Sequence, residues 1–118
     1  MRVLVGYEDA YRLYRLVLAA AIEDSRPHPR VRSVALADMG SELAAFDPHA
    51  VVCSRPTTEY GRGNTSAWLQ LPAEPNQPGY ICLGGDHEVA VNAGLAKVLR
   101  VLDEAEEGLR RGALEGLS

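Results

Sequence analysis

Short apolar runs alternate with helical patterns along the first half of the chain. Apolar runs at residues 2–5, 31–36 and 50–54 predict three strands, and the second alternates most, so one of its faces is expected to be less buried. Helical patterns over residues 10–24 and 42–45 separate these runs. Strands and helices in this order, with short connections, are typical of right-handed parallel βαβ units. We expect a parallel sheet with strand order 2-1-3.

The helix over residues 10–24 carries a stripe of apolar side chains that we expect to pack on the sheet. The stripe consists of Leu13, Leu16, Val17, Ala20 and Ala21. Gly6 is expected to give the first strand a tight exit. Asp9 is a candidate N-cap of the helix, because its carboxylate can accept hydrogen bonds from backbone N–H groups of the first turn.

The second half of the chain does not continue this alternation of strands and helices. Prolines and glycines interrupt residues 55–79, although residues 67–71 are suited to a strand. A Gly84-Gly85 pair then separates two apolar runs, which is a signal for an antiparallel hairpin. The alternative is a helix that starts near Asp86. With the hairpin, the chain is expected to be a three-layer α/β domain whose parallel strands are extended by antiparallel ones.

A last helix is predicted by an apolar stripe with helical spacing. Its members are Leu95, Val98, Leu99 and Leu102. Asn92 is a candidate N-cap of this helix, and Gly108 is a candidate for its end. Residues 109–118 place three leucines between glycines. We expect this tail to be either frayed or bound to a partner.

Composition narrows the classes of function. The 118 residues fit one domain, and 47% of them are hydrophobic, which excludes a chain that is disordered throughout. A net charge of −4 argues against a general nucleic-acid binder, which needs a basic surface. The longest strongly apolar run, residues 16–22, is too short to span a bilayer, and no signal segment opens the chain. We expect a cytoplasmic protein that binds neither nucleic acid nor a membrane.

Two stretches of the first half carry a family resemblance. One is residues 2–5 followed by the acidic pair Glu8 and Asp9, and the other is residues 47–54. Together they resemble the receiver domains of bacterial two-component response regulators, over about residues 1–56. The resemblance implies a flavodoxin-like fold. It also implies an acidic pair after the first strand that binds magnesium, and a phosphorylated aspartate at the end of the third strand.

The residues that carry receiver chemistry are mostly replaced in this chain. Glu8 matches the acidic pair, whereas Asp9 matches it only after a shift of one residue. Ser54 stands at the position of the phosphorylated aspartate. Receivers also carry a lysine on their fifth strand, but Lys97, the only lysine here, falls in a predicted helix. The resemblance therefore implies a receiver-like fold without phosphotransfer.

The first functional hypothesis follows from these replacements. Aspartyl phosphorylation needs a carboxylate nucleophile beside a divalent metal ion, so we assign no catalytic residue, no metal site and no cofactor. We expect a noncatalytic signalling or protein-interaction domain, a pseudo-receiver that binds a protein partner or itself as a homodimer. The last helix and its tail are the candidate dimer surface. Helix capping is the alternative role of Glu8 and Asp9.

The second hypothesis is a small anionic-ligand or nucleotide-binding module. Open α/β sheets bind ligands at the carboxyl ends of their strands, where Glu8, Asp9, Ser54 and Arg55 are expected. Arg62 and Asn64 follow in a glycine-rich loop. Glycines let backbone N–H groups approach an oxyanion, and arginine donates two parallel hydrogen bonds to it. A solvated loop is the alternative interpretation.

The third hypothesis is an enzyme that uses Glu8 and Asp9 or a thiol. Cys53 is the candidate nucleophile, with His49 or His87 as its base. His49 lies too far along the strand to reach Cys53, whereas His87 follows the glycine pair and is the better candidate. The alternative is that both cysteines are buried, inert and reduced. Trp68 is either a lid or a core residue, and we expect it in the core.

Overall fold

The computed structural model describes residues 1–25, 30–54, 67–72, 77–83, 86–91 and 94–117. Within these ranges six strands form one sheet with the order β2-β1-β3-β4-β5-β6. The strands are β1 (Arg2–Tyr7), β2 (Arg30–Ala35), β3 (Ala50–Cys53), β4 (Ala67–Gln70), β5 (Pro78–Leu83) and β6 (Asp86–Val91). β2, β1, β3 and β4 are parallel, while β5 and β6 are each antiparallel to the strand before them. The expected order 2-1-3 and the antiparallel hairpin are confirmed, and the alternative helix at Asp86 is wrong.

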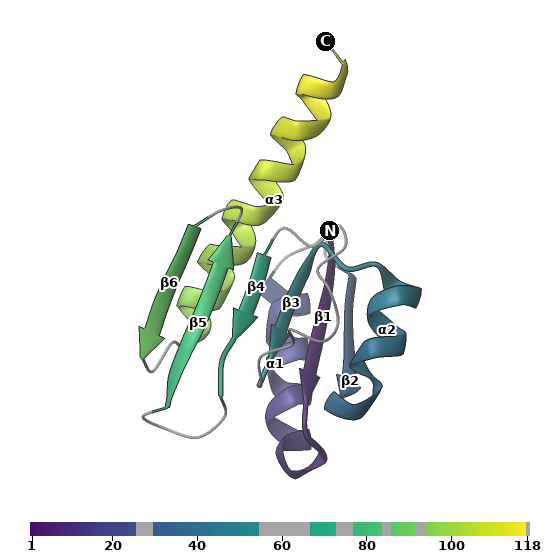
Figure 1. Ribbon diagram of the computed structural model, residues 1–118, viewed down its shortest axis with the longest axis vertical. Coiled ribbons are helices and arrows are strands. Elements are labelled where there is room, and N and C mark those ends of the chain that lie inside the picture. Colours follow the sequence, from purple (N-terminus) through teal and green to yellow (C-terminus); the bar gives the residue numbers. More distant parts are fainter. Residues whose placement is uncertain (26–29, 55–66, 73–76, 84–85, 92–93, 118) are drawn as a thin grey trace.

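Three helices cover the two faces of the sheet. They are α1 (Arg12–Ser25), α2 (Met39–Phe46) and α3 (Leu95–Leu117), with short 3-10 turns η1 (Asp9–Tyr11) and η2 (Leu36–Asp38) before the first two. α1 and α3 share one core with the sheet, and α2 packs in a second core on the other face. In Figure 1, α1 and α3 lie behind the sheet, and α3 continues well past the ends of the strands. The three-layer α/β class is confirmed.

β1 lies at the centre of the core because both of its faces are covered. Val3, Val5 and Tyr7 point into the core of α1 and α3, while Leu4 points into that of α2. Gly6 also faces α2, and a Cβ atom there would overlap the side chain of Met39. Gly6 therefore lies inside the strand and permits close packing of α2. The expected tight exit at Gly6 is wrong.

The buried face of α1 is not the one that the apolar stripe indicated. The residues of α1 that are buried are Arg15, Leu18, Ala19 and Ile22, and they follow one another at helical spacing. Leu13 and Val17, from the expected stripe, are instead 78% and 67% exposed. Two stripes compete on this helix, and the less apolar one packs on the sheet. The prediction of the helix was right, but its orientation was wrong.

Two expected helix boundaries also need correction. Asp9 is not an N-cap of α1, because it lies in η1, whose N-cap is Glu8 without a side-chain capping bond. Gly108 does not end α3, which continues to Leu117, so residues 109–117 are helical rather than frayed. Asn92 lies outside the described residues. Gly94 accepts hydrogen bonds at the start of α3, from the backbone N–H groups of Lys97 and Val98.

Candidate functional site

The carboxyl ends of β1 and β3 bring Glu8 and Ser54 together, as the sequence predicted. The backbone N–H of Ser54 donates to the carbonyl oxygen of Gly6 at 3.3 Å, which extends the pairing of the two strands by one residue. The hydroxyl of Ser54 donates to the Oε1 atom of Glu8 at 3.4 Å. Ser54 is buried and Glu8 half-buried. This arrangement joins a hydroxyl to a carboxylate and offers little to an anion.

Arg15 also reaches this end of the sheet, although its position in the sequence pattern did not indicate this. Its guanidinium donates to the carbonyl oxygen of Tyr7 at 3.2 Å and lies 3.9 Å from a carboxylate oxygen of Asp9. Arg15 is only 9% exposed, and its buried Nε atom has no hydrogen-bond partner among the described residues. The sequence did not predict this role, because Arg15 lies off the apolar stripe of α1 that was expected to face the sheet. Asp9 thus pairs with Arg15, whereas Glu8 accepts the hydroxyl of Ser54.

Tyr7 fastens the end of β1 to the segment after β4. Its hydroxyl donates to the carbonyl oxygen of Leu71 at 2.7 Å, and its ring meets that of Tyr14 edge to face at 5.1 Å. Burial, with a smaller contribution from Tyr14, raises the pKa of the Tyr7 phenol far above its ordinary value. Tyr7 therefore stays protonated and acts as a fixed hydrogen-bond donor rather than as an acid or base.

The other expected ligand residues Arg55, Arg62 and Asn64 lie outside the described residues. Arg15, which does reach this sheet end, is already engaged by Tyr7 and Asp9. Among the residues that the structure places, no three His, Cys, Asp or Glu side chains are grouped so that they can hold a metal ion.

Cys53 and His87 do not form the thiol–base pair that the sequence indicated. Cys53 is buried in β3, as expected, but His87 lies on β6, three strands away in the sheet, so it cannot serve Cys53. His87 instead contacts Cys82, whose Sγ atom lies 2.8 Å from its Nδ1 atom. Cys82 is half-buried and not fully buried as expected. The prediction that Trp68 belongs to the core is confirmed, because it is 8% exposed.

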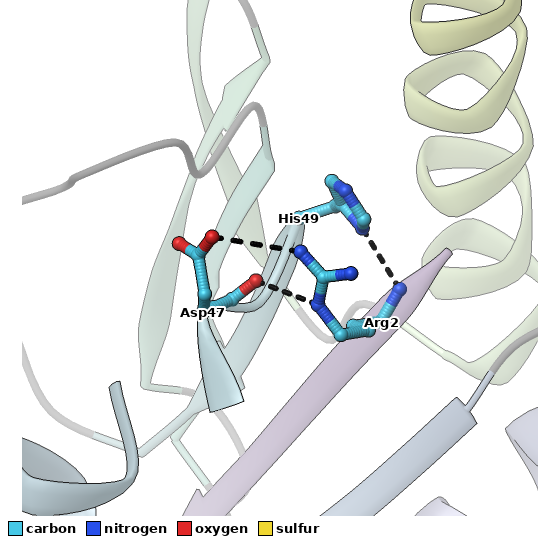
Figure 2. A network of polar contacts seen from close by, with 3 residues as sticks. All are labelled: Arg2, Asp47 and His49. Atoms are coloured by element: carbon cyan, nitrogen blue, oxygen red, sulfur yellow. Dashed lines mark hydrogen bonds and ion pairs between the residues drawn. The ribbon is translucent and has the colours of Figure 1, made fainter. Parts of the chain in front are cut away.

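His49 takes part in a polar network at the opposite, amino ends of β1 and β3 (Figure 2). The backbone N–H of Arg2 donates to His49 Nδ1 at 2.9 Å. The guanidinium of Arg2 donates to the carbonyl oxygen of Asp47 at 2.9 Å and lies 3.6 Å from its carboxylate. Asp47 ends α2 in the left-handed conformation, with φ of 48°. This network joins β1 to the chain before β3.

Among the described residues, several large apolar side chains of α1 are exposed on one surface. Leu13, Leu16 and Val17 are exposed there by 78%, 43% and 67%. A cavity of about 350 Å³ opens beside them, between α1 and the start of α3. Its walls are mostly apolar and include Tyr14, Val17, Ala21, Leu95 and Val98. On soluble proteins, large contiguous apolar patches are uncommon and are often functional.

Comparison with known proteins gives no relative from which to transfer a function. No protein-family model, no curated protein and no solved structure matches the chain. Within the described ranges, no helix is both long and apolar enough to cross a lipid bilayer.

Proposed function

We propose that this protein is a noncatalytic interaction domain that works as a homodimer, joined through the exposed apolar face of α1. We call this surface the α1 face and define it as Leu13, Leu16, Val17 and Ala20. The observation that carries the proposal is the exposure of Leu13 and Val17, 78% and 67%, on the outer side of α1. A partner that covers these side chains gains roughly 25 cal/mol of binding free energy for each Å² of apolar surface that it removes from water.

The charges at the two ends of α1 favour a second copy as the occupant. Arg12 begins the helix, and Glu23 and Asp24 lie in its last turn. A helix N-terminus favours acidic side chains and a C-terminus basic ones, so these charges oppose the dipole of their own helix. In an antiparallel pair of α1 helices, by contrast, each basic end meets the acidic end of the other copy.

The same pairing is symmetric and places the apolar residues at its centre. Arg12 and Glu23 are eleven residues apart, about three turns of helix, so they share one side of α1. Leu16 and Val17 lie midway between them. A twofold axis near these residues brings Arg12 of each copy to Glu23 of the other, with apolar contacts between the two charge pairs. An isologous interface requires such self-complementarity.

A receiver-like origin is the second part of the proposal. It is supported by the parallel order 2-1-3 and by Glu8 and Ser54, which meet where a receiver holds its metal site and its phosphorylated aspartate. A hydroxyl that donates to a carboxylate replaces the phosphoryl-accepting arrangement. Signalling would then depend on assembly rather than on phosphate. The antiparallel β5 and β6 depart from the all-parallel receiver sheet.

The test compares one substitution at two sites of similar exposure. Val17→Glu places a charge in the α1 face, whereas Val89→Glu places it on β6, where Val89 is 62% exposed. We expect the wild-type chain and Val89→Glu to sediment as dimers and Val17→Glu to sediment as a monomer with unchanged circular dichroism. A monomeric wild-type chain at tens of micromolar would refute the dimer. A dimer that persists in Val17→Glu would refute the α1 face as its interface.

A further inference from the structure

The β5–β6 hairpin holds a thiol beside an imidazole. Cys82 and His87 lie directly opposite each other in the register of the two strands. The Sγ atom of Cys82 is 2.8 Å from Nδ1 of His87 and 3.7 Å from its Nε2. A thiol reacts as the thiolate, and an imidazole within hydrogen-bond distance can accept its proton. The pair thus combines a nucleophile with a base.

The thiol lies among aromatic side chains on the face of the sheet that α3 leaves uncovered. Trp68, Cys82 and His87 occupy one row across β4, β5 and β6, so their side chains share a face. Ile81, which points to the other face, is buried in the core that α1 and α3 share. Figure 1 shows these two helices behind the sheet. Tyr80 lies two residues before Cys82 on the same face and is 52% exposed. The half-buried thiol can therefore be approached beside the exposed phenol ring of Tyr80, while the buried indole of Trp68 is its neighbour on β4.

We infer that Cys82 is a covalent modification site for α,β-unsaturated carbonyl compounds, with His87 as its base. The Sγ proton passes to Nδ1 of His87, and the thiolate forms a C–S bond to the β-carbon of the electrophile. The π electrons of the carbon–carbon double bond move to the α-carbon as an enolate, which takes the proton back from the imidazolium. The addition has no leaving group and consumes no oxidant or further reactant.

The surroundings favour a carbon electrophile over a peroxide. The ring of Tyr80, which is 52% exposed, offers apolar surface to an unsaturated chain and nothing to a small peroxide. Oxidation of Cys82 to a sulfenic acid is usually followed by attack of a second thiol. The other cysteine of the chain, Cys53, is buried in β3, two strands from β5, and cannot reach it.

The test measures the rate of alkylation of the folded chain by N-ethylmaleimide at pH 7, with N-acetylcysteine as the reference thiol. An ordinary thiol is only a few per cent thiolate at pH 7. We expect Cys82 to react at least about tenfold faster than the reference, because Nδ1 of His87, 2.8 Å from Sγ, can accept the thiol proton as the C–S bond forms. Peptide mass mapping assigns the adduct, and buried Cys53 should stay unmodified. The adduct should also change the fluorescence of Trp68, the only tryptophan.

Two variants separate the role of His87 from a general effect on the hairpin. His87→Gln keeps a hydrogen-bonding side chain that accepts no proton, and its rate should fall about tenfold to that of the reference. Val89→Ala changes an exposed residue of the same strand and should leave the rate unchanged. Equal rates in wild type and His87→Gln would overturn the inference. So would a Cys82 that reacts readily with hydrogen peroxide, trapped by dimedone, but no faster than the reference with N-ethylmaleimide.

Discussion

At the scale of single residues, His49 joins the amino ends of β1 and β3 through a bond that depends on its protonation. Its Nδ1 atom accepts the backbone N–H of Arg2, so the neutral ring must carry its proton on Nε2 (Figure 2). A second proton on Nδ1 breaks this bond. Burial, followed by the positive charges of Arg2 and the N-terminal amine, lowers the pKa of His49, while Asp47 opposes the shift.

This pKa direction predicts a loss of stability in mild acid. The unfolded chain titrates His49 near pH 6.5 and the folded chain only at lower pH, so below about pH 6.5 the unfolded state binds more protons. The contribution of His49 is complete above that pH and is lost as the pH falls towards the folded pKa. We expect the free energy of unfolding, measured in urea, to fall between pH 7.5 and 5.5.

The matched variant is His49→Asn, whose amide oxygen can accept the Arg2 N–H and does not titrate in this range. Its free energy of unfolding should be flatter than that of wild type over the same interval. Parallel pH curves for the two proteins would show that His49 carries none of the dependence.

The sequence predicted part of the site at the carboxyl ends of β1 and β3, but not the contact between Arg15 and Tyr7. Glu8 and Ser54 were placed correctly because parallel strands fix which of their ends meet. Arg15 was missed because helical periodicity treats a charged residue as solvent-facing, yet its guanidinium satisfies the buried carbonyl of Tyr7. The Cys82–His87 contact could have been predicted from the sequence. A two-residue Gly-Gly turn sets 83 opposite 86 and therefore 82 opposite 87.

At the scale of elements, α3 is longer than its packing requires. Its buried residues among those described, Val98, Val101, Leu102 and Ala105, span about two of its turns, and the helix then continues past the sheet (Figure 1). Gly108 is exposed, with open space where a Cβ atom would be. Glycine is the usual signal for a helix end, which explains why the end of α3 was misplaced. Here the turns on both sides continue the helix through it.

Gly108→Ala should therefore strengthen α3. Glycine within a helix costs roughly 0.5–1 kcal/mol relative to alanine, because it loses more backbone freedom on ordering. We expect more helical circular dichroism, slower amide exchange in residues 109–117 and a rise of at most about 1 kcal/mol in the free energy of unfolding. Gly79→Ala is the contrasting control. Its Cβ would lie 2.6 Å from the carbonyl oxygen of Gln70, so it should destabilise the sheet. Unchanged helicity in Gly108→Ala would contradict the continuous helix.

The orientation of α1 shows why elements are easier to predict than their packing. Both candidate stripes have helical spacing, so the period identifies the helix without choosing its face. Which face of α1 is buried depends on the sheet. There Arg15 donates a hydrogen bond to the carbonyl oxygen of Tyr7, and Leu18 and Ile22 pack in the core. Apolar content alone selects the other stripe. A mismatch between the most apolar face and the buried face is itself a sign that a second surface has to be covered.

At the scale of the whole molecule, the dimer proposal explains both the apolar α1 face and the charges that flank it. The charges of α1 oppose its own dipole, so Arg12→Glu and Glu23→Arg should each stabilise the isolated helix by roughly 0.3–1 kcal/mol. In an antiparallel dimer, each single substitution also turns two attractive pairs into repulsive ones. Folding stability and dimer affinity should then change in opposite directions.

The double variant Arg12→Glu with Glu23→Arg restores both charge pairs with their signs exchanged. It therefore tests whether the two α1 helices pair antiparallel. We expect each single variant to raise the dissociation constant of the dimer roughly tenfold at low salt, since exposed ion pairs contribute 0.2–1 kcal/mol each and two are inverted. The double variant should return to the affinity of wild type, and 0.5 M salt should narrow all differences because it screens the charges. Sedimentation velocity over a concentration series measures these constants. Additive losses in the double variant would mean that Arg12 and Glu23 do not meet across the interface, and an antiparallel α1 pairing would be excluded.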